Sequence, residues 1–115
     1  MRQPGPLELQ CRYDIMMAVD VLKFEWDEAK NASNQRKHGV SFEEAQSVFA
    51  DEFGRLIADP DHSHEEDRFI LLGMSPRLQV LVVCHCYRYG DTVRIISARK
   101  ANRSERSHYE GYKYA

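Results

Sequence analysis

The sequence has no apolar run that approaches the roughly 20 residues required for a membrane-spanning helix. Residues 1–20 contain Pro4, Pro6, Glu8 and Asp14, and they lack the continuous apolar stretch of a secretory signal. We therefore expect a cytoplasmic protein that makes no contact with a membrane.

Cysteine is scarce: the chain has three, and an odd number does not suit a closed disulfide framework. Cys84 and Cys86 flank His85, so on an extended strand the two thiols point to one side and the imidazole to the other. This arrangement lacks the paired C-x-x-C pattern of a zinc site, and we expect reduced, packed thiols.

Signatures of several common activities are also missing. There is no G-x-S-x-G motif of a serine hydrolase and no glycine-rich phosphate-binding loop. Without a helix-turn-helix or zinc-finger pattern, we do not expect the chain to bind DNA by itself. The 115 residues, 43% of them hydrophobic, are sufficient for one compact domain with a single core.

The charges are divided unevenly along the chain, although the net charge is only −2. Residues 1–76 carry eight Lys and Arg against fifteen Asp and Glu, a net charge of −7. Residues 77–115 carry eight against three, a net charge of +5. A basic C-terminal third can bind phosphates, although solvated surface charge explains the same asymmetry without a ligand.

Hydrophobic periodicity predicts an α+β fold for residues 22–115. The expected order is a short N-terminal strand, two helices, a four-stranded antiparallel meander and a C-terminal helix. The strands are expected at residues 21–26, 55–58, 68–74, 78–89 and 92–99, and the helices at 28–38, 42–49 and 102–112. Residues 1–21 are an extension, expected to be disordered or the product of a start-site error.

The stretch "KHGVSFEEA" predicts a corner between the first two helices. Gly39 can end the first helix in the left-handed conformation, and Ser41 can cap the second, with Glu44 reaching back as a capping box. Asn102 and Glu105 predict the same box at the last helix. The first helix is expected to present, outward or toward a cleft, Asn34, Lys37 and His38.

Alternation along the strand at 78–89 separates two sides. One side is expected to be core until Arg88 emerges, and it carries Val80, Val82, Cys84, Cys86 and Arg88. Arginines recur at strand ends and along the last helix, at Arg68, Arg88, Arg99, Arg103 and Arg106. A guanidinium can bind two phosphate oxygens at once, although solubilising arginines produce the same pattern.

The loop "DPDHSHEED" offers a metal alternative, because His62, His64 and the nearby carboxylates are ligands that divalent ions accept. An H-x-H step in a loop is no preformed site, and no second cluster completes it. We therefore expect no metal site and no cofactor.

Three separated stretches together resemble one known family. They are "KFEWDEAKNASNQRKHGVSFEEAQSVF", "DPDHSHEEDRFILLGMS" and "VRIISARKANRSERSHYE". In this order they are similar to the BrnT toxins of type II toxin–antitoxin modules, over residues 23–112. The N-terminal extension departs from the family, whose members usually begin just before the "FEWD" stretch.

The resemblance implies a RelE-like fold, RNA cleavage that inhibits translation, and neutralisation by a BrnA-like antitoxin. That antitoxin carries a ribbon-helix-helix domain, so the toxin would form a hetero-oligomer and reach operator DNA only through its partner. In a metal-free ribonuclease a base activates the ribose 2′-hydroxyl, and fixed cations stabilise charge on the phosphate. Candidate roles on this basis are phosphate binding for Arg68, Arg88 and Arg99; proton transfer or substrate placement for Lys37, His38 and Glu66; and RNA contact for Trp26, Arg103 and Arg106.

Two other functions remain open from the residues alone. The chain could be a non-catalytic module that binds protein or RNA through the same basic surface. It could also be a metal-dependent nuclease that uses the loop of His62 and His64. For Trp26, a place in the core competes with stacking on a base.

Overall fold

The computed structural model describes residues 22–58 and 68–113. The predicted extension at 1–21 and the loop with His62, His64 and Glu66 lie outside these residues. Among the described helices, none is long and apolar enough to span a membrane. The elements, in order, are β1 (Lys23–Glu25), α2 (Glu28–His38), α3 (Phe42–Ser47), a 3-10 turn (Val48–Ala50), β2 (Arg55–Ala58), β3 (Arg68–Met74), β4 (Val80–Arg88), β5 (Thr92–Lys100) and α4 (Arg103–Lys113). The predicted α+β class and element order are confirmed.

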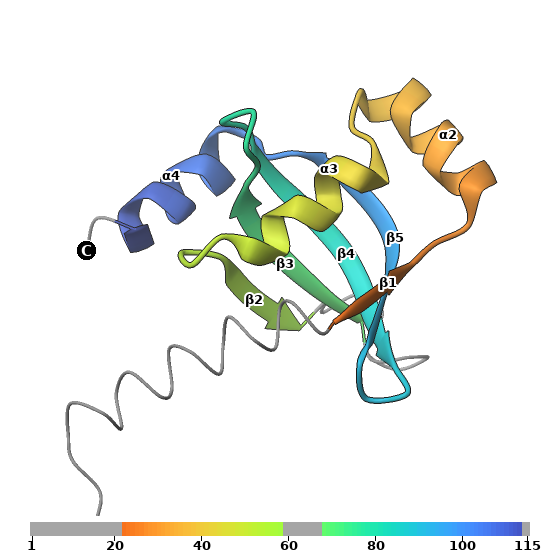
Figure 1. Cartoon of the computed structure of the whole chain (residues 1–115). Coiled ribbons are helices and arrows are strands. Elements are labelled where there is room, and N and C mark those ends of the chain that lie inside the picture. The colour runs from red at the N-terminus through yellow and green to blue at the C-terminus, as the bar shows by residue number, and fades with distance from the viewer. Residues whose placement is uncertain (1–21, 59–67, 114–115) are drawn as a thin grey trace, which may run out of the picture.

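One five-stranded sheet, with strand order β1-β5-β4-β3-β2, organises these elements (Figure 1). Strands β2 to β5 form the predicted antiparallel meander. The short β1 pairs with β5 in parallel, with Phe24 opposite Val93. Residues distant in sequence therefore meet at this edge of the sheet.

Both faces of the sheet carry buried residues: the expected core on the side of Val80 and Val82 is confirmed, and the side of Leu81 and Val83 is core as well. Helix α3 covers the larger cluster, which contains Val40, Phe42, Ala45, Val48, Leu71, Leu81, Val83, Val93, Ile95 and Ala98. Helix α4 covers the opposite face, where the cluster contains Leu72, Val80, Val82, Ala101 and Tyr109. Because each face is covered by a helix, β4 is apolar on both sides along its first half.

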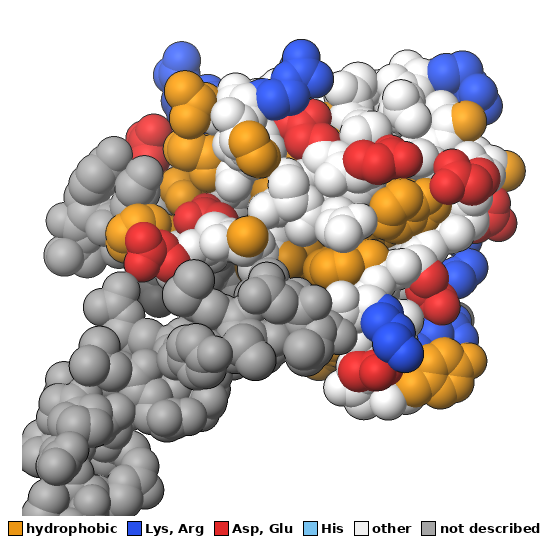
Figure 2. Space-filling model, viewed as in Figure 1, with side chains coloured by type: hydrophobic (Ala, Val, Ile, Leu, Met, Phe, Trp, Pro, Cys, Tyr) orange, Lys and Arg blue, Asp and Glu red, His pale blue; other side chains and the backbone are white. Residues whose placement is uncertain are grey.

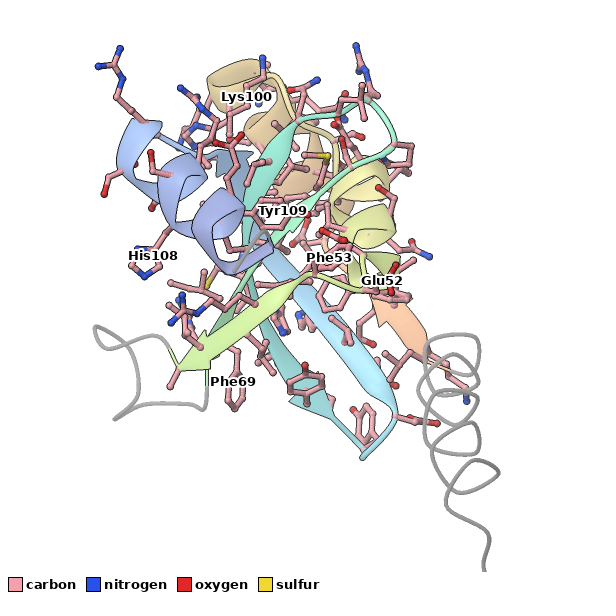
Figure 3. The ribbon with its side chains drawn as sticks, turned by 90° about the vertical axis from the view of Figure 1, so that its left-hand side faces the viewer. Glu52, Phe53, Phe69, Lys100, His108 and Tyr109 are labelled. Carbon is pink, nitrogen blue, oxygen red and sulfur yellow. The ribbon has the colours of Figure 1, made fainter. Side chains whose placement is uncertain are left out.

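Helix α4 is fixed at both ends of its contact with the sheet. Asn102 and Glu105 form the predicted capping box: the Glu105 amide donates to Asn102 Oδ1 at 2.8 Å, and the Asn102 amide donates to Glu105 Oε1 at 2.9 Å. Further along, Tyr109 is buried and its hydroxyl donates to Asp51 Oδ2 at 2.6 Å. Figure 3 shows Tyr109 directed from α4 into the molecule, near Phe53, whereas His108 points away.

Asn34 points inward, which corrects the expectation that it faces outward or toward a cleft. Its amide nitrogen donates to Val40 O at 2.8 Å and to Ala98 O at 2.7 Å, and its oxygen accepts from the Ala98 amide at 3.1 Å. Strand β1 pairs only with Thr92–Arg94, so the edge of β5 at Ala98 lies beyond it. The Asn34 side chain pairs with this edge as a neighbouring strand would.

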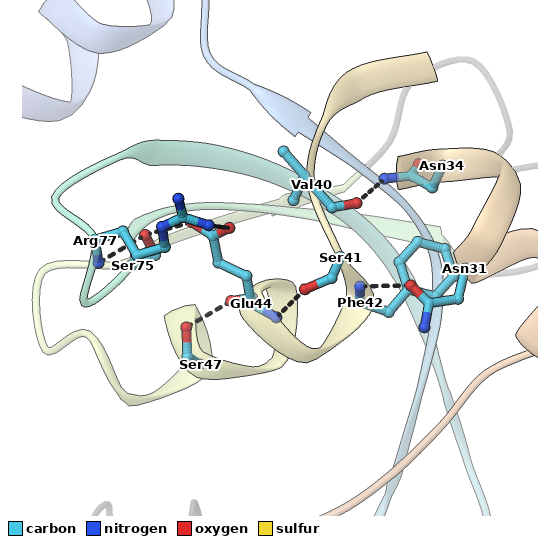
Figure 4. Close-up of polar contacts among 9 residues, drawn as sticks. All are labelled: Asn31, Asn34, Val40, Ser41, Phe42, Glu44, Ser47, Ser75 and Arg77. Carbon is cyan, nitrogen blue, oxygen red and sulfur yellow. Dashed lines mark hydrogen bonds and ion pairs between the residues drawn. The ribbon is translucent and has the colours of Figure 1, made fainter. Parts of the chain in front are cut away.

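The predicted corner between α2 and α3 forms, with one difference (Figure 4). Gly39 has a φ of +69°, and Ser41 Oγ accepts from the Glu44 amide at 3.0 Å. The Glu44 carboxylate does not complete the capping box, because it accepts from Ser75 Oγ at 2.7 Å and lies near Arg77. The corner is therefore tied to the turn between β3 and β4.

Within residues 22–58 and 68–113, two residues other than glycine have positive φ, and both lie in hairpin turns next to β4. Leu78, before β4, has a φ of +62°, and Tyr89, after β4, has a φ of +58°. Both side chains are exposed, at 78% for Leu78 and 84% for Tyr89. Large side chains disfavour this conformation, because the Cβ atom crowds the backbone.

Candidate functional site

A row of charged side chains crosses four strands on the face of the sheet that α4 shares. The register places Arg68 opposite Cys86, Cys86 opposite Arg94, and Arg94 opposite Glu25. Directly opposed residues point to the same face of a sheet. Arg88, two residues after Cys86, points to this face as well. We call the surface formed by Glu25, Arg68, Cys86, Arg88 and Arg94 the arginine face.

A β-bulge brings Arg94 to this face. Ser97 pairs with Cys84 while Ile95 pairs with His85, so the strands shift register there and β5 contains one extra residue. Regular alternation would have placed Arg94 on the same side as Ala98, which is buried under the helices. The bulge reverses this relation, so Arg94 shares its face with Arg99.

Glu25 lies between two of the arginines. Its Oε2 atom is 3.0 Å from Arg94 Nη1 and 3.7 Å from Arg88 Nε. All three side chains are partly exposed, at 32% to 44%. The pKa of Arg88 is raised, mainly by a hydrogen bond with the Cys86 side chain and less by the nearby Glu25 carboxylate. A carboxylate held by two guanidiniums occupies the position that a phosphate oxygen could take.

Arg99 has a structural role in this arrangement. Its guanidinium donates to both carboxylate oxygens of Glu105, each at 2.8 Å, and thereby holds the first turn of α4 on β5. The bond raises the pKa of Arg99 and lowers that of Glu105. Arg99 pairs with Val82, four residues along β4 from Cys86, so it lies toward the α4 end of the same face.

The other predicted candidates do not belong to the strands that form the arginine face. Lys37 and His38 are exposed in the last turn of α2. Within the described part of the chain, neither side chain forms a hydrogen bond or ion pair with a residue of the arginine face. Trp26 donates to Glu28 and packs against Phe42 on the helix side. Two more lie exposed on α4, Arg103 and Arg106. Figure 2 shows acidic side chains over the middle of the face that carries α2 and α3, with lysine and arginine side chains along its edges.

Glu25 and Arg94 were missed by the reading of the sequence. Both lie in strands of alternating polarity, where a charged residue ordinarily indicates a solvated side. The parallel pairing of β1 with β5 brings them together. No local signal in "VLKFEW" indicates this pairing, because it joins residues almost 70 positions apart.

An aromatic cluster around His85 occupies the opposite face at the same end of the sheet. The ring of His85 contacts Phe49, Phe69 and Tyr87, with centroid distances of 4.9, 6.2 and 5.1 Å. Figure 3 shows Phe69 at this end of the sheet. His85 Nδ1 lies 3.2 Å from Val83 O and Nε2 lies 3.2 Å from the Tyr87 hydroxyl. A neutral ring satisfies both contacts, because one nitrogen donates and the other accepts.

The stability of the fold is expected to fall between neutral pH and pH 4 because of His85. Burial lowers its pKa from 6.5 to about 4, so the unfolded chain binds more protons in this range and is favoured as the pH drops. The full effect is about 3 kcal/mol. Urea unfolding of the wild type at steps from pH 7 to pH 4 should show this loss, and His85→Phe should show a flatter profile. Parallel profiles would contradict the assignment, whatever the absolute stability of the variant.

Comparison with known proteins agrees with the fold and its motifs. A family model described as "Ribonuclease toxin, BrnT, of type II toxin-antitoxin system" matches residues 26–105. The 1.1 Å crystal structure of the Brucella abortus ribonuclease toxin BrnT is similar, with a TM-score of 0.57 and 23% sequence identity, covering 71% of this chain and 99% of that one. No match was found among curated proteins. The structural likeness supports the predicted fold, and the family match extends over most of the sequence. The chain therefore belongs to the BrnT family of ribonuclease toxins of type II toxin–antitoxin systems.

Proposed function

We propose that this chain cleaves RNA without a metal ion and that the arginine face binds the scissile phosphate. The observation that carries the proposal is the row Glu25–Arg94–Cys86–Arg68, with Arg88 beside it. Strands hold these groups in fixed positions, so their charge needs little rearrangement when the phosphate becomes more negative. The row also supplies a carboxylate that can accept a proton.

The reaction needs one proton acceptor, one proton donor and fixed positive charge. Glu25 accepts the proton of the ribose 2′-hydroxyl, and the 2′-oxygen attacks the adjacent phosphorus. Arg88 and Arg94 transfer their hydrogen bonds from Glu25 to the phosphoryl oxygens, and the bond to the 5′-oxygen breaks as that oxygen gains a proton. The products are a 2′,3′-cyclic phosphate and a 5′-hydroxyl end. DNA lacks the nucleophile and is not cleaved.

The site residues predicted from the sequence have different roles in this proposal. Arg68 contributes to phosphate binding, and Glu66, two residues before it in the sequence, is a candidate proton donor. Lys37 and His38 form no hydrogen bond or ion pair with Glu25 or the arginines within the described residues, so we assign them no chemical step. For Arg99 we propose a structural contribution, because its two hydrogen bonds to Glu105 hold the first turn of α4 on β5.

The toxin–antitoxin family implies a protein antitoxin. We propose that it is a BrnA-like ribbon-helix-helix protein, that it neutralises the toxin in a hetero-oligomer, and that it alone contacts operator DNA. RNA cleavage by the free toxin would then inhibit translation in the cytoplasm.

The proposal is tested by incubating the purified chain with a defined single-stranded RNA in excess chelator. We expect cleavage with cyclic phosphate ends and no cleavage where a 2′-deoxynucleotide replaces the scissile nucleotide. Glu25→Gln preserves the shape of the side chain but removes the proton acceptor, so kcat should fall about 100-fold or more.

The rival functions give different results in the same assay. Cleavage that requires an added divalent ion would favour a metal-dependent nuclease using His62 and His64. RNA binding by a folded wild type that never cleaves would favour a non-catalytic module. Full activity of a folded Glu25→Gln protein would remove Glu25 from the mechanism.

A further inference from the structure

Tyr89 occupies a position for which folding favours a different residue. It lies at the tip of the hairpin between β4 and β5, where both Tyr89 and Gly90 have positive φ, at +58° and +80°. Asn, Asp and Gly are the residues that suit such positions in hairpins. A tyrosine there has an unfavourable backbone, and its ring gains little from burial, because 84% of the residue is exposed.

The tip is held in place by β1. The Lys23 amide donates to Asp91 O at 2.9 Å, and Lys23 Nζ lies 3.7 Å from an Asp91 carboxylate oxygen. The Thr92 hydroxyl donates to the Asp91 carboxylate at 2.9 Å. These contacts fix the backbone next to Tyr89, so a ligand that used its ring would have little ordering of the loop to overcome.

The neighbours of Tyr89 indicate what such a ligand would be. It directly follows Arg88, whose guanidinium lies 3.7 Å from Glu25 in the arginine face. Single-stranded nucleic acid is commonly bound by a basic surface beside exposed aromatic rings, on which unpaired bases stack. Tyr89 therefore presents an exposed ring one residue after an arginine of the candidate phosphate site.

We propose that Tyr89 is a stacking platform for an unpaired RNA base next to the scissile phosphate. The inference rests on the proposed function, because it takes the arginine face as the phosphate site. Tyr89 thereby contributes to substrate binding and to the choice of cleavage position, whereas the arginines and Glu25 carry out the reaction. Stacking accepts any base, and because stacking strength grows with ring size, purines should be modestly preferred over pyrimidines.

The chain contains a matched control for this position. Leu78 has the same strained conformation and similar exposure, but it lies at the opposite end of β4. Asn suits the left-handed region, so Tyr89→Asn and Leu78→Asn should both raise the melting temperature. Only Tyr89→Asn should weaken RNA binding. Tyr89→Phe keeps the ring and should bind as the wild type does.

The experiment measures binding of RNA that carries a 2′-O-methyl group at the scissile nucleotide, with single abasic substitutions on either side. In the wild type and in Leu78→Asn, one abasic position should lower the affinity about tenfold. In Tyr89→Asn the same position should make no difference, because the platform is already absent.

Three results would overturn the inference. Equal abasic effects in the wild type and Tyr89→Asn would remove Tyr89 from base contact while leaving the proposed function intact. Loss of binding in Leu78→Asn equal to that in Tyr89→Asn would assign the effect to the backbone of the hairpins. Absence of any RNA binding by the wild type would overturn the proposed function and, with it, the role of Tyr89.

Discussion

Replacing Arg88 and Arg94 together by alanine should lower kcat/KM for RNA cleavage by about 100-fold or more, with the fold retained. The two guanidiniums meet at Glu25 Oε2, at 3.7 and 3.0 Å, on adjacent positions of the arginine face. If they transfer to the phosphate, their removal affects the transition state more than the bound substrate. The loss should therefore appear mainly in kcat, measured with the purified double variant and a defined RNA.

The control for this prediction is Arg36→Ala, which removes an exposed guanidinium from α2. Arg36→Ala should leave cleavage unchanged. If positive charge in general were what mattered, cleavage would fall in Arg36→Ala as well as in the double variant. Arg99→Ala should behave differently again, because it removes the pair with Glu105 and loosens α4. We expect it to lower the melting temperature as well as activity. A folded Arg88→Ala/Arg94→Ala protein with wild-type kcat would show that the phosphate binds elsewhere.

Asn34→Ala should lower the free energy of unfolding by about 3 kcal/mol, since it leaves three buried backbone groups without partners. These groups are Val40 O, Ala98 O and the Ala98 amide, all bonded to the Asn34 side chain at 2.7 to 3.1 Å. For a domain of this size the melting temperature should fall by roughly 10–20 °C. Thermal and urea unfolding measure the change directly.

Asn34→Asp tests the same contacts without changing the size of the side chain. An ionised carboxylate at this position would face two carbonyl oxygens, so the fold should raise the pKa of the introduced carboxyl above the unfolded value of about 3.9. Stability should then be higher below that value and fall as the pH rises through the raised pKa. Lys30→Ala, at an exposed position of the same helix, should change stability little. A small effect of both Asn34 variants would mean that water replaces the lost bonds.

The order of helices and strands could be predicted from the sequence, because hydrophobic periodicity and helix caps depend on residues that are close together in the chain. The change of hydrophobic period after residue 50 predicted the start of the meander. Gly39 and Asn102 marked helix ends because left-handed φ and side-chain capping depend on neighbouring residues only. The three family motifs are continuous stretches of sequence, so they indicate the family without knowledge of the tertiary structure.

The same locality explains where the sequence was misleading. Glu44 appeared in a capping-box position, but Ser75 and Arg77, from the turn before β4, compete for its carboxylate. Asn34 was expected to face outward or toward a cleft because it lies on a polar helix. Its side-chain amide instead forms hydrogen bonds with the backbone of Ala98, on the edge of β5 beyond β1. Arg99 was expected from its strand-end position to bind phosphate; its guanidinium pairs with Glu105, a contact that the sequence did not indicate, and its role toward RNA stays a prediction.

By itself, the sequence determined the family, the α+β class, the order of the elements and the caps of the helices. Only the tertiary structure decided which charged residues meet. The parallel pairing of β1 with β5 brings Glu25 to Arg94, and the bulge opposite Cys84 and His85 turns Arg94 to the face that carries Arg68 and Arg88. Both depend on strand pairing between distant segments, and a shift of one residue in register reverses the side on which a residue lies.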